Sequence, residues 1–165
     1  MMNVADIKKI SQIAEKHKLL FIVDNTFLSP YFQNPLDLGA DIVVHSGTKY
    51  LGGHNDTLTG FLVTSREDIS EQLRFIIKTT GVGLSPFDSW LLLRGIKTLG
   101  IRMEKSQKNA ITIANWLKEQ KAVPKEILEK NGITEATLRL SVGIEDVTDL
   151  LDELREVFDE IQSNK

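Results

Sequence analysis

A buried strand that runs straight into a polar turn is the feature that most restricts how this chain can fold. Residues 41–44 (Asp-Ile-Val-Val) begin with an acid and continue with branched apolar residues, as in a strand covered on both faces. Residues 45–56 then carry hydroxyls, glycines and Lys49. A lysine at the exit of such a strand is poorly placed for solvation, which favours its neutral, nucleophilic form. Because such a lysine can form a Schiff base with an aldehyde, the turn is a candidate chemical site.

The segments around this turn predict alternating α/β organisation. Apolar spacing predicts a helix over residues 4–17 with Asn3 as its N-cap, and Leu19–Val23 is a continuous apolar run typical of a buried parallel strand. Residues 42–44 and 60–64 complete three strands of parallel type. Ligands gather at the carboxyl ends of such strands, so we expect Asp24 and the turn at Ser46–Lys49 to share a pocket.

The remainder of the chain is mainly helical. Helices are predicted over Arg66–Lys78 and from Ser85, with Pro86 in the first helical position, to about Gln120. Gly95 and Gly100 are points where that long helix can kink or restart. The remaining predicted elements are a helical turn at Pro35–Leu38, a helix over Val123–Asn131, a strand over Thr137–Val142 and a final helix that Asp146 caps.

Composition excludes several classes of function. The 165 residues suffice for one ordinary domain, and a net charge of −3 with scattered lysines and arginines argues against nucleic-acid binding. There is no cysteine, and His17, His45 and His54 do not have the spacing of metal ligands, so we expect no metal site. No apolar run approaches the roughly 18 residues of a membrane span, and the start resembles no targeting signal, so a cytoplasmic protein is expected.

The chain resembles the Cys/Met-metabolism family of pyridoxal-phosphate (PLP) enzymes, the cystathionine synthases and lyases. The resemblance begins with Asp24-Asn25-Thr26 and His45-Ser46-Gly47-Thr48-Lys49-Tyr50, and the distance from the acid to the lysine makes it specific. It continues through residues 52–56 (Gly-Gly-His-Asn-Asp), 84–90 (Leu-Ser-Pro-Phe-Asp-Ser-Trp), 94–99 (Arg-Gly-Ile-Lys-Thr-Leu) and 138–146 (Leu-Arg-Leu-Ser-Val-Gly-Ile-Glu-Asp).

This resemblance implies an α/β fold of the aspartate aminotransferase-like type, fold type I of PLP-dependent transferases. Residues 1–98 would be part of the large PLP-binding domain, 99–122 a connecting helix, and 123–165 a remnant of the small C-terminal α+β domain. The implied activity is transsulfuration in methionine and cysteine metabolism. It would be either γ-replacement on an O-acylhomoserine, as in cystathionine γ-synthase, or elimination from cystathionine, as in the lyases. A homo-oligomer acting on an amino-acid substrate is expected.

The resemblance also assigns roles to single residues. Lys49 would hold PLP as a Schiff base and move the Cα proton, and Asp24 would hold the protonated pyridine nitrogen. Opposite charges about 4 Å apart attract by about 4 kcal/mol at an effective dielectric of 20, which is ample for this purpose. Ser46 and Thr48 would bind the phosphate through hydroxyls that point to one side. Arg139 would grip the substrate α-carboxylate through its planar guanidinium.

Each of these residues also has an ordinary structural interpretation when its local pattern is taken alone. Lys49 could be a surface lysine after a strand, and Asp24 could close the strand in an Asx turn. The hydroxyls of Ser46 and Thr48 are common in turns. Arg139 could lie on a solvated strand face. Only the combined motif favours the functional interpretation.

Compared with the family, the chain looks shortened at its start and again after residues 116–120 (Trp-Leu-Lys-Glu-Gln). The N-terminal segment that it lacks supplies a glycine-rich phosphate turn and an aromatic ring stacked on the cofactor. We therefore expect exposed apolar surface and self-association. The alternative hypothesis is an inactive remnant that binds PLP weakly or only associates with other subunits.

Overall fold

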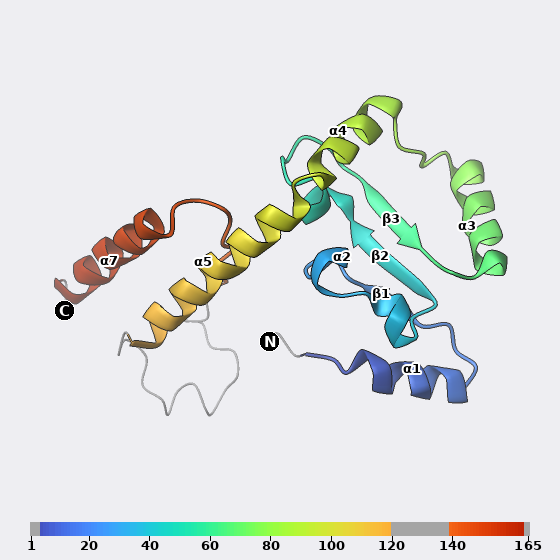
Figure 1. The fold of residues 1–165 in the computed structure, drawn as a ribbon, viewed down its shortest axis with the longest axis horizontal. Coiled ribbons are helices and arrows are strands. Elements are labelled where there is room, and N and C mark those ends of the chain that lie inside the picture. Colours follow the sequence, from blue (N-terminus) through green and yellow to red (C-terminus); the bar gives the residue numbers. More distant parts are fainter. Residues whose placement is uncertain (1–3, 120–138, 164–165) are drawn as a thin grey trace. The chain divides into compact units, whose positions relative to one another are not determined.

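The computed structural model describes residues 4–119 and 139–163, which form two compact units. The described residues up to Gly100 form the first unit, and those from Ile101 onward form the second. Figure 1 shows a small sheet with helices α1 to α4 in the first unit, whereas most of α5 and all of α7 belong to the second. The helix predicted over Val123–Asn131 lies outside the described residues.

A three-stranded sheet of order β1-β2-β3 forms the centre of the first unit (Figure 1). Strands β1 (Ile22–Asp24) and β2 (Ile42–Ser46) are parallel, as predicted. Strand β3 (Gly60–Val63) is antiparallel to β2, with Gly60 beside Ser46, so the prediction of a third parallel strand is wrong. The reason is that the chain turns back at the carboxyl end of β2 with no crossover helix to return it to the other end.

The two parallel strands differ in burial. In β2, Ile42 and Val43 are 5% and 2% exposed, which confirms the predicted buried strand. In contrast, Ile22 of β1 is 51% exposed, and Leu19 and Leu20 before it are exposed as well. The prediction of a buried strand over Leu19–Val23 is therefore wrong, because β1 is an edge strand of the described sheet.

Helix α1 (Ile7–Lys16) begins three residues later than predicted. The carboxylate of Asp6 accepts a hydrogen bond from the amide of Lys9 at 3.0 Å and so caps the first turn. The predicted start after Asn3 is therefore wrong. The connection from β1 to β2 contains helix α2 (Ser29–Phe32) and the single turn η1 (Pro35–Leu38), the second of which confirms the prediction.

The later helices of the first unit begin and end close to the predicted positions. Helix α3 (Glu67–Thr80) ends at Gly81, whose φ of +73° favours glycine. Helix α4 (Pro86–Ile96) begins after Ser85, whose hydroxyl accepts a hydrogen bond from the amide of Asp88 at 3.1 Å. Helix α5 (Leu99–Glu119) follows after two residues, so the expected break in the long helical segment is confirmed.

In the second unit, α5 packs against α7 (Val147–Ser163). The ring centroids of Trp116 and Phe158 lie 5.7 Å apart in an edge-to-face contact. Asp146 caps α7 as predicted, because its carboxylate accepts from the amide of Thr148 at 2.8 Å. The predicted strand over Thr137–Val142 is wrong for residues 139–142, since the described part of this unit contains no strand with which they could pair.

Large apolar side chains remain exposed on α3 and α4, as expected. Phe75 is 69% exposed, Phe87 66% and Trp90 53%. Such surface is unusual for a stable monomer and is typical of a face that another segment or subunit covers.

None of the helices in the described ranges combines the length and the apolar character that crossing a membrane requires.

Candidate functional site

The candidate site lies at the carboxyl ends of the two parallel strands. Asp24 is the last residue of β1 and pairs with Val44 in the sheet register, while Ser46 is the last residue of β2. The amide of Asn25 donates to the carbonyl of Val44 at 2.9 Å and so extends the pairing past Asp24. The sheet thus brings Asp24 and the turn that carries Lys49 to neighbouring strand ends, as the topology predicts.

Thr26 joins these two strand ends. Its amide donates to the carboxylate of Asp24 at 2.9 Å, and its hydroxyl oxygen accepts from the amide of Ser46 at 2.8 Å. Hydrogen bonds from the hydroxyl and the amide of Thr26 lower the pKa of Asp24, and the nearby ring of His45 lowers it further. Asp24 is therefore stabilised in its charged form. Its side chain is exposed and so remains accessible to a ligand.

His45 supports the site from the sheet. It is 5% exposed and borders an apolar cavity of about 250 Å³ together with Val43, Phe61 and Val63. Burial lowers the pKa of His45, against the opposing effect of the Asp24 charge. Its Nδ1 atom has no hydrogen-bond partner among the described residues. His45 is thus a buried side chain whose lowered pKa favours the neutral ring.

The two hydroxyls of the turn are in different situations. The Thr48 hydroxyl donates to the carbonyl of Thr59 at 3.3 Å and accepts from the amide of Thr59 at 3.0 Å. The Ser46 hydroxyl has no hydrogen-bond partner in the described part of the chain. Because a hydroxyl has a single proton, Ser46 is the one that is free to donate to a ligand in this conformation.

Lys49 lies in the short helical turn η2 (Gly47–Leu51), where its backbone is not helical. Hydrogen bonds from the amide of Gly52 to Gly47 and from Gly53 to Lys49, both 2.8 Å long, close the turn. The Lys49 side chain is exposed, and its amine has no partner within the described residues. The burial expected at this strand exit is therefore wrong, because the described segments leave this side of the turn uncovered.

Helix α4 approaches the turn at a glycine. A Cβ atom on Gly95 would overlap the carbonyl oxygen of Gly52, so only glycine allows α4 to lie this close. Gly52 thus serves the backbone path of the turn.

Arg139 belongs to the second unit, whereas the other candidate residues belong to the first. It is exposed and lies in the segment 139–146, which leads into α7. The carbonyls of Gly143 and Glu145 in this segment accept hydrogen bonds from the side chain of Asn109 on α5.

Sequence reasoning assigned no role to three residues that hold this arrangement, namely Thr26, Asn25 and Asn109. Asn25 is 2% exposed, donates to the carbonyls of Ser29 and Gln33 at 3.1 and 2.8 Å, and accepts from the Gln33 side chain at 2.8 Å. The polar triplet 24–26 directly after an apolar run was the available signal for Asn25 and Thr26. Nothing local distinguished Asn109 from other helical residues.

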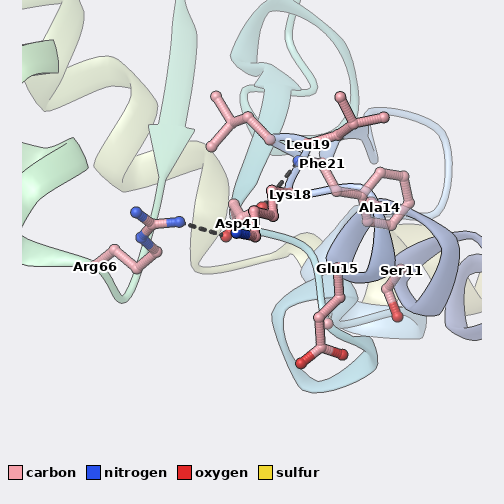
Figure 2. A pocket seen from close by; sticks show the side chains of 10 residues that line it. Ser11, Ala14, Glu15, Lys18, Leu19, Phe21, Asp41 and Arg66 are labelled. Atoms are coloured by element: carbon pink, nitrogen blue, oxygen red, sulfur yellow. Dashed lines mark hydrogen bonds and ion pairs between the residues drawn. The ribbon is translucent and has the colours of Figure 1, made fainter.

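A pocket of about 680 Å³ lies at the opposite end of the strands (Figure 2). The carboxylate of Asp41, just before β2, accepts from the amide of Phe21 at 2.8 Å and pairs with Arg66 at 3.0 Å. The hydrogen bond from Phe21, together with Arg66, lowers the pKa of Asp41. Two of the charged side chains that line this pocket, Asp41 and Arg66, are therefore paired with each other, and none of the candidate residues lines it.

The described residues contain no cluster of three or more side chains able to hold a metal ion. The described geometry instead provides a charged carboxylate, a free hydroxyl and a free amine on neighbouring segments of the first unit.

Comparison with known proteins identifies the chain with a class of PLP-dependent enzymes. The family described as Cys/Met metabolism PLP-dependent enzyme matches residues 1–125. The chain belongs to this family, and its fold is a part of the α/β fold type I that the related structures share.

Particular relatives include both synthases and lyases. The chain is 48% identical over 132 residues to a cystathionine γ-synthase of Haemophilus influenzae, covering 80% of this chain and 36% of the relative. It is 53% identical over 123 residues to a cystathionine γ-lyase of Bacillus subtilis, covering 74% of this chain and 32% of the relative. The structure of cystathionine γ-lyase from yeast matches with a TM-score of 0.83 at 30% identity, over 93% of this chain and 60% of that protein.

The chain thus spans about a third of the length of these two curated relatives.

Proposed function

We propose that this chain carries the cofactor-binding and proton-transferring residues of a PLP-dependent transsulfuration enzyme. The observation that carries the proposal is that Thr26 holds Asp24 and Ser46 next to each other through its two hydrogen bonds. Ser46 precedes Lys49 by three residues, and the amine of Lys49 has no partner among the described residues. Bound PLP supplies an electron sink that stabilises the carbanion left when a substrate Cα loses its proton.

The residues present fit this cofactor. A carboxylate with a lowered pKa, such as Asp24, suits a protonated pyridine nitrogen because it stays charged across the neutral range. The free hydroxyl of Ser46 suits a phosphate oxygen. Thr48 would donate to the phosphate only after its hydroxyl gives up the 3.3 Å hydrogen bond to the Thr59 carbonyl. The exposed amine of Lys49 is accessible to an aldehyde.

Each residue then has one task in the proposed reaction. Asp24 would hold the ring nitrogen in its protonated form, and Ser46 and Thr48 would bind the phosphate. Lys49 would hold the cofactor through its aldehyde and would carry the proton that leaves the substrate Cα. Arg139 binds the substrate α-carboxylate through two parallel hydrogen bonds, a role that rests on the motif of residues 138–146.

The reaction is either γ-replacement on an O-acylhomoserine, as in a γ-synthase, or elimination from cystathionine. Identities of 48% to a γ-synthase and 53% to a γ-lyase support both. The proposal includes a place in methionine and cysteine metabolism, a cytoplasmic location and assembly into a homo-oligomer. It also retains residues 1–98 as part of the large domain, 99–122 as connector and 123–165 as part of the small domain.

The decisive experiment is to add PLP to the purified chain, record its visible absorbance and reduce the complex with borohydride. We expect an absorbance band of lysine-bound PLP and a reduced adduct that peptide mapping locates at Lys49. Lys49→Ala should lose both, whereas Lys78→Ala, which removes another exposed lysine on α3, should keep them. If the unchanged chain forms neither band nor adduct, it is not a PLP enzyme on its own, and the remnant hypothesis replaces the proposal.

A further inference from the structure

Asn109 on α5 is fully buried and uses both of its amide protons. Its exposed fraction is 0%, and Nδ2 donates to the carbonyls of Gly143 at 3.0 Å and Glu145 at 2.8 Å. These carbonyls lie 34 and 36 residues further along the chain, in the segment before α7. One side chain thus links α5 to a segment that forms no helix or strand over residues 139–146.

The other atom of the same amide has no partner. Oδ1 of Asn109 is buried without a hydrogen bond among the described residues. An unpaired buried acceptor is unfavourable. The presence of asparagine at this position is therefore better explained by its two donated hydrogen bonds than by the volume of its side chain. An apolar residue of equal size would avoid the unpaired oxygen but would leave two buried carbonyls without a donor.

The segment that Asn109 binds is held firmly at one end only. Asp146 fixes its carboxyl end by accepting from the amide of Thr148 at 2.8 Å, and Asn109 binds the residues just before it. Arg139, at the other end, is exposed, and no hydrogen bond or ion pair holds its side chain to the described residues. The backbone between Arg139 and Gly143 therefore determines where the guanidinium of Arg139 lies.

We propose that Asn109 is a positioning residue that fixes residues 139–146 against α5 and thereby sets the place at which Arg139 meets a substrate carboxylate. The second half of this inference rests on the proposed function, which assigns the carboxylate to Arg139. The first half concerns the chain alone and is tested without cofactor or substrate.

The first test compares Asn109→Leu with Asn115→Leu. Leucine has the same branching of side-chain heavy atoms as asparagine but no donors, and Asn115 is an exposed asparagine on the same helix with no described partner. We expect the NMR order parameters of the backbone amides of residues 143–146 to decrease in Asn109→Leu and to stay unchanged in Asn115→Leu. Unchanged order parameters in a folded Asn109→Leu protein overturn the proposal.

A measurement on the unchanged protein covers the case in which Asn109→Leu does not fold. The side-chain amide protons of Asn109 should exchange with water at least tenfold more slowly than those of Asn115, as observed by NMR. Equal exchange rates would mean that the two hydrogen bonds do not persist in solution, and the proposal would fail.

The second half is tested with the PLP-loaded chain and an O-acylhomoserine or cystathionine. Poor placement of Arg139 should raise KM about tenfold in Asn109→Leu while kcat changes less than twofold. A purely structural defect would instead lower kcat with KM unchanged, because fewer molecules would be folded, and that result would overturn the substrate-positioning role. If the unchanged chain has no turnover at all, the proposed function fails, while the NMR experiments still decide whether Asn109 anchors the segment.

Discussion

At the scale of single residues, Thr26 joins the two strand ends of the candidate site. Its hydroxyl and amide stabilise the charged form of Asp24, and its hydroxyl oxygen also accepts from the Ser46 amide. Asp24 and Ser46 come from neighbouring strands, so one short side chain sets the spacing between the carboxylate and the turn. Valine has the same shape as threonine but cannot make the hydroxyl contacts.

We therefore expect Thr26→Val to move the pKa of Asp24 upward, towards the ordinary value of 3.8. In the folded protein a carboxyl with a lowered pKa adds stability that is complete above its ordinary pKa and is lost as the pH falls through the lowered value. With the hydroxyl removed, this loss on acidification should become smaller. An NMR titration of the Asp24 carboxyl carbon measures the shift directly.

Thr79→Val is the matched control for this prediction. The Thr79 hydroxyl donates to the Phe75 carbonyl within the exposed helix α3, away from the candidate site in sequence. Its replacement should leave the Asp24 titration unchanged. An unaltered pKa in Thr26→Val as well would show that the hydroxyl is not the main cause of the shift.

At the scale of secondary-structure elements, the contact of α4 with the lysine turn depends on Gly95. A methyl group there would overlap the Gly52 carbonyl, while the amide of Gly52 closes the turn by donating to Gly47 at 2.8 Å. Movement of Gly52 would thus disturb the backbone around Lys49. Alanine is better than glycine in a helix by about 1 kcal/mol, but overpacking against a fixed backbone costs about 1–3 kcal/mol.

For Gly95→Ala we accordingly expect a net decrease in the free energy of unfolding of about 1–2 kcal/mol, since a backbone carbonyl cannot rotate away as a side chain can. Urea denaturation of the first unit provides the measurement. Gly83→Ala is the control, because no atom lies within 4 Å of the added methyl group and the backbone there is not left-handed. A Gly95→Ala protein more stable than the unchanged chain would show that α4 does not pack on the turn in solution.

The prediction of secondary structure from sequence succeeded where the cause was local. The starts of α4 and α7 follow from Ser85 and Asp146, whose side chains bind amides two or three residues away. The start of α1 was misplaced because two residues, Asn3 and Asp6, were both able to cap it. The predicted strand at 137–142 failed because a strand needs a neighbouring strand, which a local pattern cannot supply.

At the scale of the whole molecule, the chain exposes more apolar surface than a stable monomer normally does. Phe75 on α3 and Phe87 and Trp90 on α4 are more than half exposed. The chain covers about a third of the length of its curated γ-synthase and γ-lyase relatives. Apolar surface in water favours association.

We expect the chain to self-associate as its concentration increases, and the Phe75→Glu, Phe87→Glu double variant to associate at least several-fold more weakly. Sedimentation velocity over a range of concentrations measures the effect, with circular dichroism to confirm that helix content is retained. Val4→Glu, at a residue that is 99% exposed before α1, should leave association unchanged. Equal association of all three proteins would assign the contact to another surface.

The sequence by itself determined the family, the alternation of helices and strands, and the placement of Asp24 at the end of one strand and of Lys49 in the turn that follows another, because these depend on residue order and short-range hydrogen bonds. Only the tertiary structure decided that β3 runs antiparallel to β2 and that Thr26 joins β1 to β2. It also decided that α4 packs closely on the lysine turn at Gly95 and that Asn109 binds the segment before α7. These features join residues that are well separated along the chain. Their energies depend on which surfaces meet, and a linear pattern does not contain that information.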